Sequence, residues 1–370
     1  MNIMFRKVKF IFAKVIKKLK LNDLFYKLLK CFCVQNINSE YMDLTKCKKE
    51  LNDFYSNNTH SSIGNNNIHE KNYNLQVIIT SYNNETYIEK CIKSVLNQKT
   101  KYKYNIVIVD DESTDNSRKI IDQYADYENI KIIYRKNGGC SAARNSGIND
   151  IYADYIIFLD SDDYMADNAI DKLLDCAYKN NADIVQGSFI SVIDGKEKKV
   201  SNDITEPNEN NLRGFDWDKV FKAELYKQIV YPVGCWFDDT ILSFLIYPQC
   251  KKICLIDDVV NYHLVNKKGM VISVVGKNKS LDTYWATEVL DGNRQELGYE
   301  NNEIYFEKLK GQFLMNYRRV YLLPEYIKKD MFYMESELLN KRYPNDTSDE
   351  FMNAIKNRNY KLYNLYAYWH

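Results

Sequence analysis

Several features that would assign this chain to a particular class of protein are missing. The net charge is only +1 over 370 residues, so the composition shows no bias toward nucleic acid. No uninterrupted apolar stretch approaches the roughly 20 residues that cross a bilayer. Lysines interrupt the N-terminal segment too often for the apolar core of a signal peptide. We therefore expect a cytoplasmic protein that does not bind nucleic acid.

The sequence also lacks a cysteine pattern typical of disulfides or metal sites. The chain has nine cysteines, an odd number, and no CxxC motif occurs. Several stand inside apolar segments, such as Cys91 in CIKSVL and Cys254 in ICLI. Buried free thiols in a reducing compartment are expected. The length predicts two globular parts, because domains usually run about 100–200 residues.

The N-terminal segment, residues 1–55, begins with a strongly basic stretch. Residues 1–30 hold nine basic residues and one acid, and most of the apolar side chains fall opposite the lysines on a helical wheel. Such an amphipathic helix can lie in the surface of an anionic membrane, which predicts peripheral contact with the inner face of the cell membrane. The alternative is a helix packed on the protein's own core. Residues 56–74 are polar and without periodicity, and predict a linker.

Short apolar runs alternate with helical patterns after residue 74. The predicted strands are 75–80, 105–109, 130–134 and 155–159, and the predicted helices between them are 85–97, 117–124 and 141–151. This alternation indicates βαβ units, and hence an α/β fold with a mostly parallel central sheet. Further strands are predicted over 183–193 and 253–264. From about residue 280 the pattern is helical, and the aromatic tail is either packed or a contact surface.

Polar residues follow the ends of three predicted strands. They are Ser81-Tyr82-Asn83, Asp110-Asp111 and Asp160-Ser161-Asp162-Asp163. Because ligands of such sheets bind at the carboxyl ends of the strands, we expect the functional site there. The DSD tip could direct two carboxylates toward one Mg²⁺ or Mn²⁺, which would bridge them to substrate phosphates. Taken alone a DxD is a weak signal, because aspartates end many strands and cap helices.

Four motifs follow one another over 84 residues. They are TSYNNETYIEKCIKSVLNQ (80–98), VIVDDESTDNS (107–117), NGGCSAARNSGI (137–148) and FLDSDD (158–163). Together they resemble the GT-A glycosyltransferases of family 2, over about residues 75–275. The resemblance implies a nucleotide-binding half (75–165), an acceptor half (166–275) and a helical C-terminal region (276–370). It also implies a nucleotide-sugar donor, most often UDP-linked, a Mn²⁺ or Mg²⁺ ion and inversion at the anomeric carbon.

The resemblance also implies roles for residues at the first two strand ends. Thr80, Tyr82 and Glu85 match the segment that lines the base and ribose of the donor. Asp110 matches the acid that accepts a hydrogen bond from uracil N3, with Asp111 as the second choice.

The later motifs add the rest of the implied donor site. Arg144 and Asn145 match positions near the diphosphate and the donor sugar. Asp160 matches the acid near the ribose, and Ser161 beside it is included in the donor site. Asp162 matches the direct metal ligand, with Asp160 as its companion.

Inversion needs a base that deprotonates the acceptor hydroxyl as it attacks. The matching segment is GCWFDDTILSF (234–244), in which Asp238-Asp239 replaces the family's usual Glu-Asp and Thr240 opens a helix. We expect Asp239 to be the base and Asp238 its orienting neighbour. The alternative is that both acids only favour the dipole of that helix. Lys219, in WDKVF, is expected to be structural or near the acceptor.

The segment after the predicted base departs from the family pattern. Residues 261–265 lack the usual Arg, and residues 270–271 replace the expected Ser of the loop, where Lys267 and Lys268 could supply charge. His263 could complete the metal shell, although a histidine satisfied locally is the simpler interpretation.

The rival interpretations explain less of the sequence. A receiver domain puts its acid pair after its first strand, whereas LQVIIT and a helix come before Asp110-Asp111 here. A phosphatase of the haloacid dehalogenase type is not favoured, because no Thr or Val follows the second Asp of the DSD motif at the expected place. A non-catalytic partner subunit with the same fold stays open. The favoured hypothesis is an inverting, metal-dependent transferase that moves a sugar from UDP-hexose or UDP-N-acetylhexosamine to a lipid-linked glycan, in bacterial capsule or other surface-polysaccharide synthesis.

Overall fold

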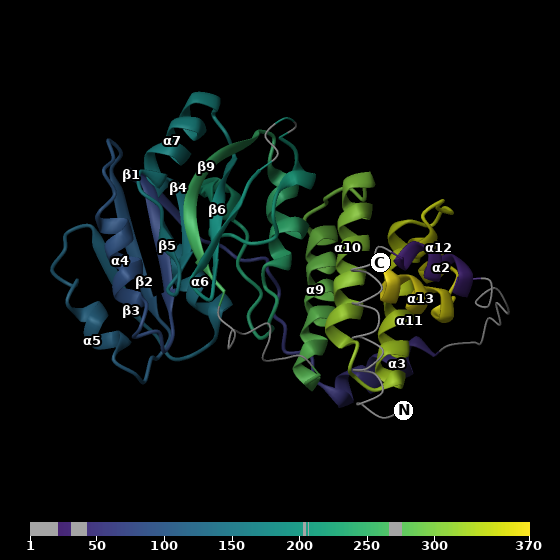
Figure 1. Cartoon of the computed structure of the whole chain (residues 1–370). Coiled ribbons are helices and arrows are strands. Elements are labelled where there is room, and N and C mark those ends of the chain that lie inside the picture. The colour runs from purple at the N-terminus through teal and green to yellow at the C-terminus, as the bar shows by residue number, and fades with distance from the viewer. Residues whose placement is uncertain (1–20, 31–42, 203–204, 206, 266–275) are drawn as a thin grey trace. The chain divides into compact units, whose positions relative to one another are not determined.

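The computed structural model describes residues 21–30, 43–202, 205, 207–265 and 276–370. The amphipathic prediction for residues 1–20 and the loop with Lys267 and Lys268 lie outside these described residues. The chain forms two compact units (Figure 1). The first takes in Met1–Asn57, Met270–Glu288 and Glu300–His370, and the second takes in Asn58–Gly269 and Val289–Tyr299.

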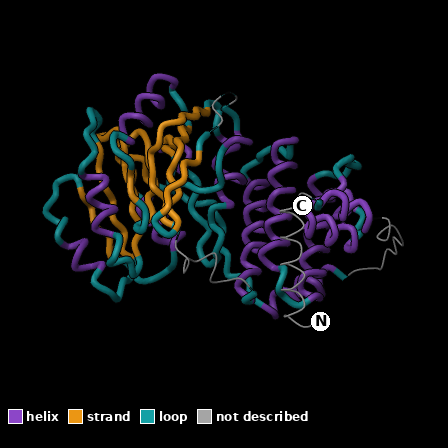
Figure 2. The backbone as a smooth tube through the Cα atoms, in the orientation of Figure 1, coloured by secondary structure: helices purple, strands orange, loops and turns teal. Residues whose placement is uncertain are grey.

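A mixed sheet forms the centre of the second unit (Figure 2), and within the described residues it has nine strands. Their order is β3-β2-β1-β4-β8-β6-β9-β5, with β7 paired to β6. Strands β1 to β4 are parallel to one another, as the alternating pattern predicts, and β8 runs antiparallel to β4. The strands are β1 (Asn67–Ser81), β2 (Tyr104–Asp110), β3 (Ile130–Tyr134), β4 (Asp150–Asp160), β5 (Tyr164–Met165), β6 (Ile184–Ile193), β7 (Lys196–Val200), β8 (Lys219–Lys222) and β9 (Ile253–Leu264).

The continuous apolar runs of β1, β2 and β4 follow from burial on both faces of the sheet. Val77 and Ile79 pack in one core with the helices α4 (Ile88–Leu96) and α7 (Ala169–Asn180). Ile78, between them, faces α6 (Cys140–Ile148), where a Cβ on Gly147 would lie 2.4 Å from its side chain. A parallel sheet covered in this way has no solvent-facing side, so its strands lack polar alternation.

The strand register brings the polar ends of β1, β2 and β4 to one edge of the sheet. Ser81 pairs with Asp110, and Thr80 pairs with Asp160. The short helix α5 (Ser117–Asp122) and helix α6 follow this edge. The prediction that these polar residues meet is confirmed.

The predicted linker differs from the structure in its second half. Residues 67–74 form the start of β1 and pair with β4. Ahead of them, the backbone N–H of His60 donates to the carbonyl of Val233 at 2.8 Å, and Ile63 forms a bridge with Ile229. Most side chains of residues 67–72 are exposed, so no apolar alternation marks this strand in the sequence.

The first unit is helical, as predicted for the C-terminal region. Within the described residues its α-helices are α2 (Asn22–Lys30), α3 (Leu44–Phe54), α10 (Glu303–Val320), α11 (Glu325–Arg342), α12 (Glu350–Lys356) and α13 (Tyr360–Trp369), together with the first part of α9 (Asp282–Glu296). The aromatic tail is packed: Tyr363 and Trp369 are buried, and Trp369 stacks on Phe25 of α2 with ring centroids 5.5 Å apart.

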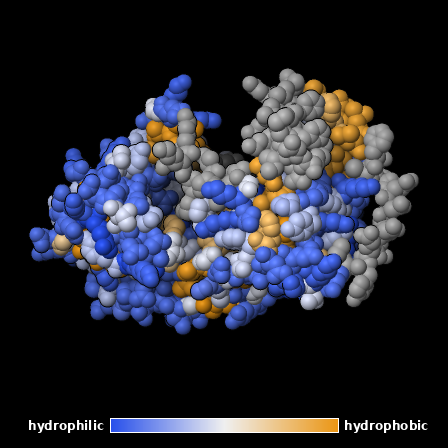
Figure 3. All heavy atoms as spheres, turned by 90° about the horizontal axis from the view of Figure 1, so that it is seen from below, coloured by the Kyte–Doolittle hydropathy of each residue, from blue (hydrophilic) through white to orange (hydrophobic). Residues whose placement is uncertain are grey.

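Apolar side chains are largely internal in the described residues, and the face drawn in Figure 3 is mainly hydrophilic with a few apolar patches. None of the described helices combines the length and the apolar character needed to span a membrane.

A buried carboxyl group lies inside the helical unit. Glu335 of α11 accepts hydrogen bonds from Asn316 Nδ2 at 2.9 Å and from the Tyr363 hydroxyl at 3.3 Å. Burial raises the pKa of Glu335 to about 8, while these two hydrogen bonds act in the opposite direction. The folded state therefore favours the neutral acid.

The pKa of Glu335 predicts that this unit loses stability as the pH rises. A raised carboxyl pKa stabilises the fold fully below about pH 4.5 and loses that contribution as the pH approaches 8, by at most about 1.4 kcal/mol per pH unit. Glu335→Gln, which is neutral throughout, should gain stability relative to the wild type between pH 5 and pH 8. Calorimetric melting measures this, with Glu337→Gln on the same helix as control. If the melting temperatures of the wild type and Glu335→Gln differ by the same amount at every pH from 5 to 8, the raised pKa of Glu335 is contradicted.

Candidate active site

Asp110, the last residue of β2, and Asp111, which follows it, have different hydrogen-bond partners. Asp110 is fully buried, and its Oδ2 accepts from Arg118 Nε at 2.8 Å. Its Oδ1 is buried with no hydrogen-bond partner in the described part of the chain. Asp111 instead accepts from the backbone N–H groups of Gly138 and Gly139. Asp111 thus holds the glycine loop, and Asp110 keeps one oxygen that lacks a donor.

Two residues of the predicted donor site tie loops together. Glu85 Oε2 accepts from the backbone N–H of Asn116 at 2.8 Å, and Ser161 Oγ accepts from Asn84 Nδ2 at 2.6 Å. These contacts fix the loops after β1, β2 and β4 to one another. Tyr82 stands apart from them with 51% of its surface exposed, so its ring face is accessible at the strand ends.

Arg144 is the centre of the site. It is buried on α6 and forms ion pairs with three carboxylates. Its Nη1 lies 2.9 Å from Asp238 Oδ2, its Nη2 lies 3.3 Å from Asp160 Oδ1, and its Nε lies 3.0 Å from Asp216 Oδ2. A buried guanidinium requires such partners, because removing its charge from water costs several kcal/mol. Arg144 therefore joins the end of β4 to the segment that carries the predicted base.

Asp216 is the part of this cluster that the sequence does not reveal. It is fully buried, and its Oδ2 also accepts from the Tyr231 hydroxyl at 2.8 Å. Asn145 is likewise committed to Tyr231: its amide donates to the Tyr231 carbonyl at 2.9 Å and accepts from the Tyr231 N–H at 2.6 Å. Asp216 lies 72 residues from Arg144 along the chain, and no motif spacing connects the two.

The DSD tip lies beside this cluster and concentrates negative charge. Burial raises the pKa of Asp160 to about 7, with Arg144 acting against the shift and Asp216 adding to it. Burial and the neighbouring Asp163 also raise the pKa of Asp162. Carboxylates held this close together favour either a proton or a cation.

The residues present fit a divalent ion bound together with phosphate. Among the described residues, no three His, Cys, Asp or Glu side chains converge into a complete metal site. Mg²⁺ commonly uses one or two carboxylates and takes its other oxygens from substrate phosphates and water. Asp162 and Asp160 could supply those carboxylates, and burial together with neighbouring acids raises the pKa of each.

His263 has a local partner. Its Nδ1 lies 3.0 Å from Asp163 Oδ2, and its ring stacks on Trp217 with centroids 4.6 Å apart. Burial opposes charge on the imidazole, but the hydrogen bond to Asp163 and the nearby acids raise the pKa of His263.

Asp238 and Asp239 lie on a turn with unusual backbone geometry. Phe237 before them has φ of 71°, a conformation that non-glycine residues rarely adopt and that often marks functional sites. Asp238 Oδ2 accepts from Ser141 Oγ at 2.8 Å as well as from Arg144. Thr240 then begins helical turns, as predicted. Asp238 is therefore fixed to α6, while its orienting role beside Asp239 stays a prediction.

Asp239 differs from its neighbour. It is half-buried, and no side-chain hydrogen bond holds its carboxylate within the part of the chain that the structure describes. Burial and the adjacent Asp238 raise the pKa of Asp239 well above its ordinary value. A carboxylate that accepts no side-chain hydrogen bond from the described residues and has a raised pKa is suited to accept a proton.

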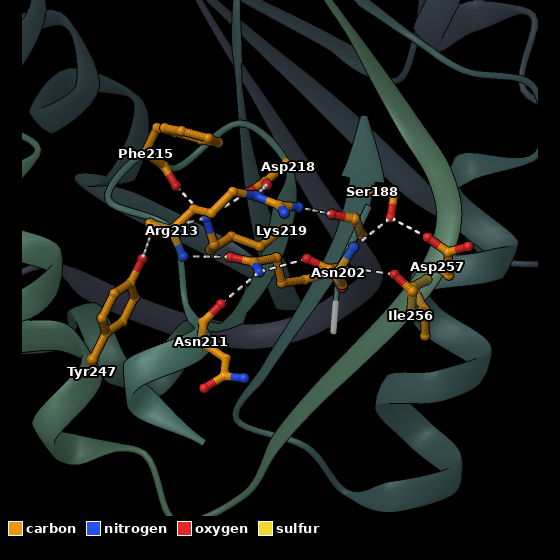
Figure 4. Close-up of polar contacts among 12 residues, drawn as sticks. Ser188, Asn202, Asn211, Arg213, Phe215, Asp218, Lys219, Tyr247, Ile256 and Asp257 are labelled. Atoms are coloured by element: carbon orange, nitrogen blue, oxygen red, sulfur yellow. Dashed lines mark hydrogen bonds and ion pairs between the residues drawn. The ribbon is translucent and has the colours of Figure 1, made fainter. Parts of the chain in front are cut away.

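Lys219 has a structural position. It is fully buried, pairs with Asp218 and donates to the carbonyl of Phe215 (Figure 4). Arg213 in the same network lies 2.7 Å from Asp218 and donates to the carbonyl of Gly187. These contacts hold the segment that carries Asp216, so the structural alternative for Lys219 is the one observed.

Comparison with known proteins places the chain among the GT-A folds. Staphylococcus aureus TarS 1-349 in complex with UDP-GlcNAc has a TM-score of 0.60 at 17% identity, covering 78% of this chain and 89% of that chain. At this identity the likeness shows the fold alone. Residues 76–236 match the family model described as Glycosyl transferase family 2. These residues therefore match the domain of this transferase family, and the resemblance of the four motifs is confirmed.

Two curated relatives are named for their substrates. The poly(ribitol-phosphate) beta-glucosyltransferase of Bacillus spizizenii is 33% identical over 213 residues, covering 54% of this chain and 33% of that protein. The poly(ribitol-phosphate) beta-N-acetylglucosaminyltransferase TarP of Staphylococcus aureus is 33% identical over 135 residues, covering 36% of this chain and 41% of that protein. The chain thus spans less than half the length of either relative.

The turn before the predicted base has no space for a larger residue at Gly234. This glycine has φ of 90°, and a Cβ on it would lie 1.8 Å from the carbonyl oxygen of Asn58. Gly234→Ala should therefore destabilise the protein by about 1–2 kcal/mol for the left-handed backbone and about 1–3 kcal/mol more for the clash.

Gly195→Ala is the matched control for this measurement. Gly195 has φ of 75° and nothing within 4 Å of an added Cβ, so it carries the backbone cost without the clash. Urea denaturation of both variants measures the difference. Equal losses of unfolding free energy would contradict the close packing of the turn against Asn58.

Proposed function

We propose that the protein is an inverting, metal-dependent glycosyltransferase that uses a nucleotide-sugar donor. The observation that carries the proposal is the joining of two sites by one residue. Arg144 contacts Asp160, at the strand end where the donor phosphates are expected, and Asp238, beside the predicted base. A transferase needs these two groups on either side of one anomeric carbon.

Asp239 is the proposed base. In this mechanism it accepts the proton of an acceptor hydroxyl while that oxygen attacks the anomeric carbon from the face opposite the diphosphate. The new carbon–oxygen bond forms as the bond to the diphosphate oxygen breaks, so the configuration inverts. The ion held by Asp160 and Asp162 would neutralise charge on the departing diphosphate. Asp238, fixed by Ser141 and Arg144, keeps the turn of Asp239 in place.

UDP-hexose or UDP-N-acetylhexosamine is the proposed donor. Asp110 Oδ1 is buried and lacks a donor within the described residues, which suits an N–H group of a base, while Arg118 holds Oδ2. The exposed ring of Tyr82 could stack on that base. The UDP-GlcNAc complex of TarS and the names of the two relatives support this donor class. By the same likeness, the proposed acceptor is a bacterial surface glycan, polymeric or lipid-linked.

Peripheral membrane contact is proposed through residues 1–30. Helix α2 packs on α13 through Phe25 and Tyr26. Leu24 and Leu28, one turn apart, are 54% and 58% exposed on the other side. Residues 1–20 bring seven basic residues and no acid to the start of this helix. Exposed leucines next to a basic stretch suit the surface of an anionic bilayer at the inner face of the cell membrane.

Asp239→Asn tests the catalytic proposal. The amide cannot accept the proton, so kcat for transfer should fall by a factor of roughly 100–10,000, because general-base catalysis contributes about that much. Binding of UDP should be retained, since Asp239 contacts only the acceptor in this mechanism. Radiolabelled sugar transfer and calorimetric titration with UDP measure the two quantities. A variant that transfers sugar at the wild-type rate would exclude Asp239 as the base.

Asp162→Ala tests the metal proposal separately. The variant should lose the Mn²⁺-dependent part of UDP affinity while the Mn²⁺-independent part remains. Titration with UDP in the presence of Mn²⁺ and of EDTA measures both. If Mn²⁺ strengthens UDP binding equally in the variant and the wild type, Asp162 is not the ligand.

The membrane proposal is tested with vesicles that contain phosphatidylglycerol. Leu24→Ser combined with Leu28→Ser should weaken co-flotation of the protein, because two apolar side chains no longer enter the bilayer. Both positions are exposed, so the melting temperature should stay the same. Removal of residues 1–30 should abolish flotation. Undiminished flotation after that removal would contradict the proposal.

A further inference from the structure

Asp216 holds one edge of the Arg144 guanidinium. Arg144 Nη2 donates to Oδ1 of Asp216 at 3.3 Å, and Nε lies 3.0 Å from Oδ2 in an ion pair that lacks hydrogen-bond geometry. Both carboxylate oxygens therefore engage the same side of the planar group. The Tyr231 hydroxyl donates a hydrogen bond to Oδ2, and the guanidinium lies over the Tyr231 ring with its central carbon 5.3 Å from the ring centroid.

The contact with Asp216 determines the direction of the third nitrogen of Arg144, Nη1. A guanidinium is rigid and planar, so fixing Nε and Nη2 also fixes the direction of Nη1. Nη1 donates to Asp238 at 2.9 Å, and Nη2 also reaches Asp160 at 3.3 Å. The Arg144 guanidinium thus pairs with three carboxylates. Without Asp216, it could shift toward Asp160 or toward Asp238.

The segment that carries Asp216 is itself held firmly. Figure 4 shows Arg213 and Lys219, at the two ends of this segment, both bound to Asp218. The Tyr247 hydroxyl donates to the carbonyl of Arg213, and Lys219 donates to that of Phe215. Asp216 therefore has a fixed support, although it lies outside every motif of the family resemblance.

We propose that Asp216 is a positioning residue of the transfer reaction, acting through Arg144 on Asp160 and Asp238. It is fully buried, so it contacts neither donor nor acceptor. Its part is to set the distance and orientation between the donor side of the site and the turn that carries Asp239. This inference rests on the proposed glycosyl transfer.

Asp216→Asn is the direct test. The amide has the same shape, but it is neutral and its nitrogen cannot accept a hydrogen bond from Arg144. The variant therefore cannot present two carboxylate oxygens to the guanidinium. We expect kcat to fall roughly 100-fold, since a misplacement of about 1 Å in reacting groups costs that much. The KM for the nucleotide sugar should change little, because the base and ribose contacts are untouched. Asp238→Asn and the double variant complete the cycle, and the two effects should not add because both act through Arg144.

Asp183→Asn is the control. Asp183 accepts from the backbone N–H groups of Lys251 and Lys252 at 2.8 and 2.9 Å, just before β6, at the opposite edge of the sheet from Asp160. Its loss should lower the melting temperature without changing kcat. A structural role for Asp216 would give the same pattern.

The outcomes separate the two proposals. If the wild type transfers sugar but Asp216→Asn keeps its kcat, or if its effect adds to that of Asp238→Asn, the positioning role is overturned and the proposed function stands. If the wild type neither transfers nor hydrolyses any nucleotide sugar, the proposed function is overturned, and the role of Asp216 with it.

Discussion

The burial of one arginine among several acids is the constraint on which the site depends. Arg144 is withdrawn from water, and an isolated charge there would cost several kcal/mol. Its ion pairs with Asp160, Asp216 and Asp238 compensate that cost. Each of these acids comes from a different part of the chain, so the arginine is satisfied only when the strand end, the buried segment and the turn are all in place. The fold and the site are thereby coupled.

The same cluster supports the proposed cation site. Burial and neighbouring carboxylates raise the pKa of Asp160, Asp162 and Asp239, and Arg144 opposes the shift for Asp160 and Asp239. A divalent ion at the DSD tip would relieve this excess on the donor side. On the proposed acceptor side no such ion is invoked, because a raised pKa suits the base role proposed for Asp239. In the proposed mechanism, Arg144 thus stands between the carboxylates that would hold the cation and the carboxylate that would accept the proton.

Much of this arrangement can be predicted from the sequence. Buried parallel strands give continuous apolar runs, and their polar ends share an edge, so Asp110 and Asp160 were expected together and are found together. The start of β1 could not be predicted, because its exposed residues show no alternation. Asp216 could not be predicted either, since its link to Arg144 is made only by folding. The loop contacts of Glu85 with Asn116 and of Asn145 with Tyr231 are likewise made only by folding, so the sequence did not indicate them.

The most direct test of the central claim is the melting temperature of the purified protein against a panel of nucleotides and nucleotide sugars, with and without Mn²⁺. A ligand that binds only the folded state raises the melting temperature according to its excess over the dissociation constant. The account predicts a Mn²⁺-dependent shift with UDP and with at least one UDP-sugar, and no comparable shift with other nucleotides. No shift with any nucleotide would contradict the account and favour a non-catalytic partner subunit.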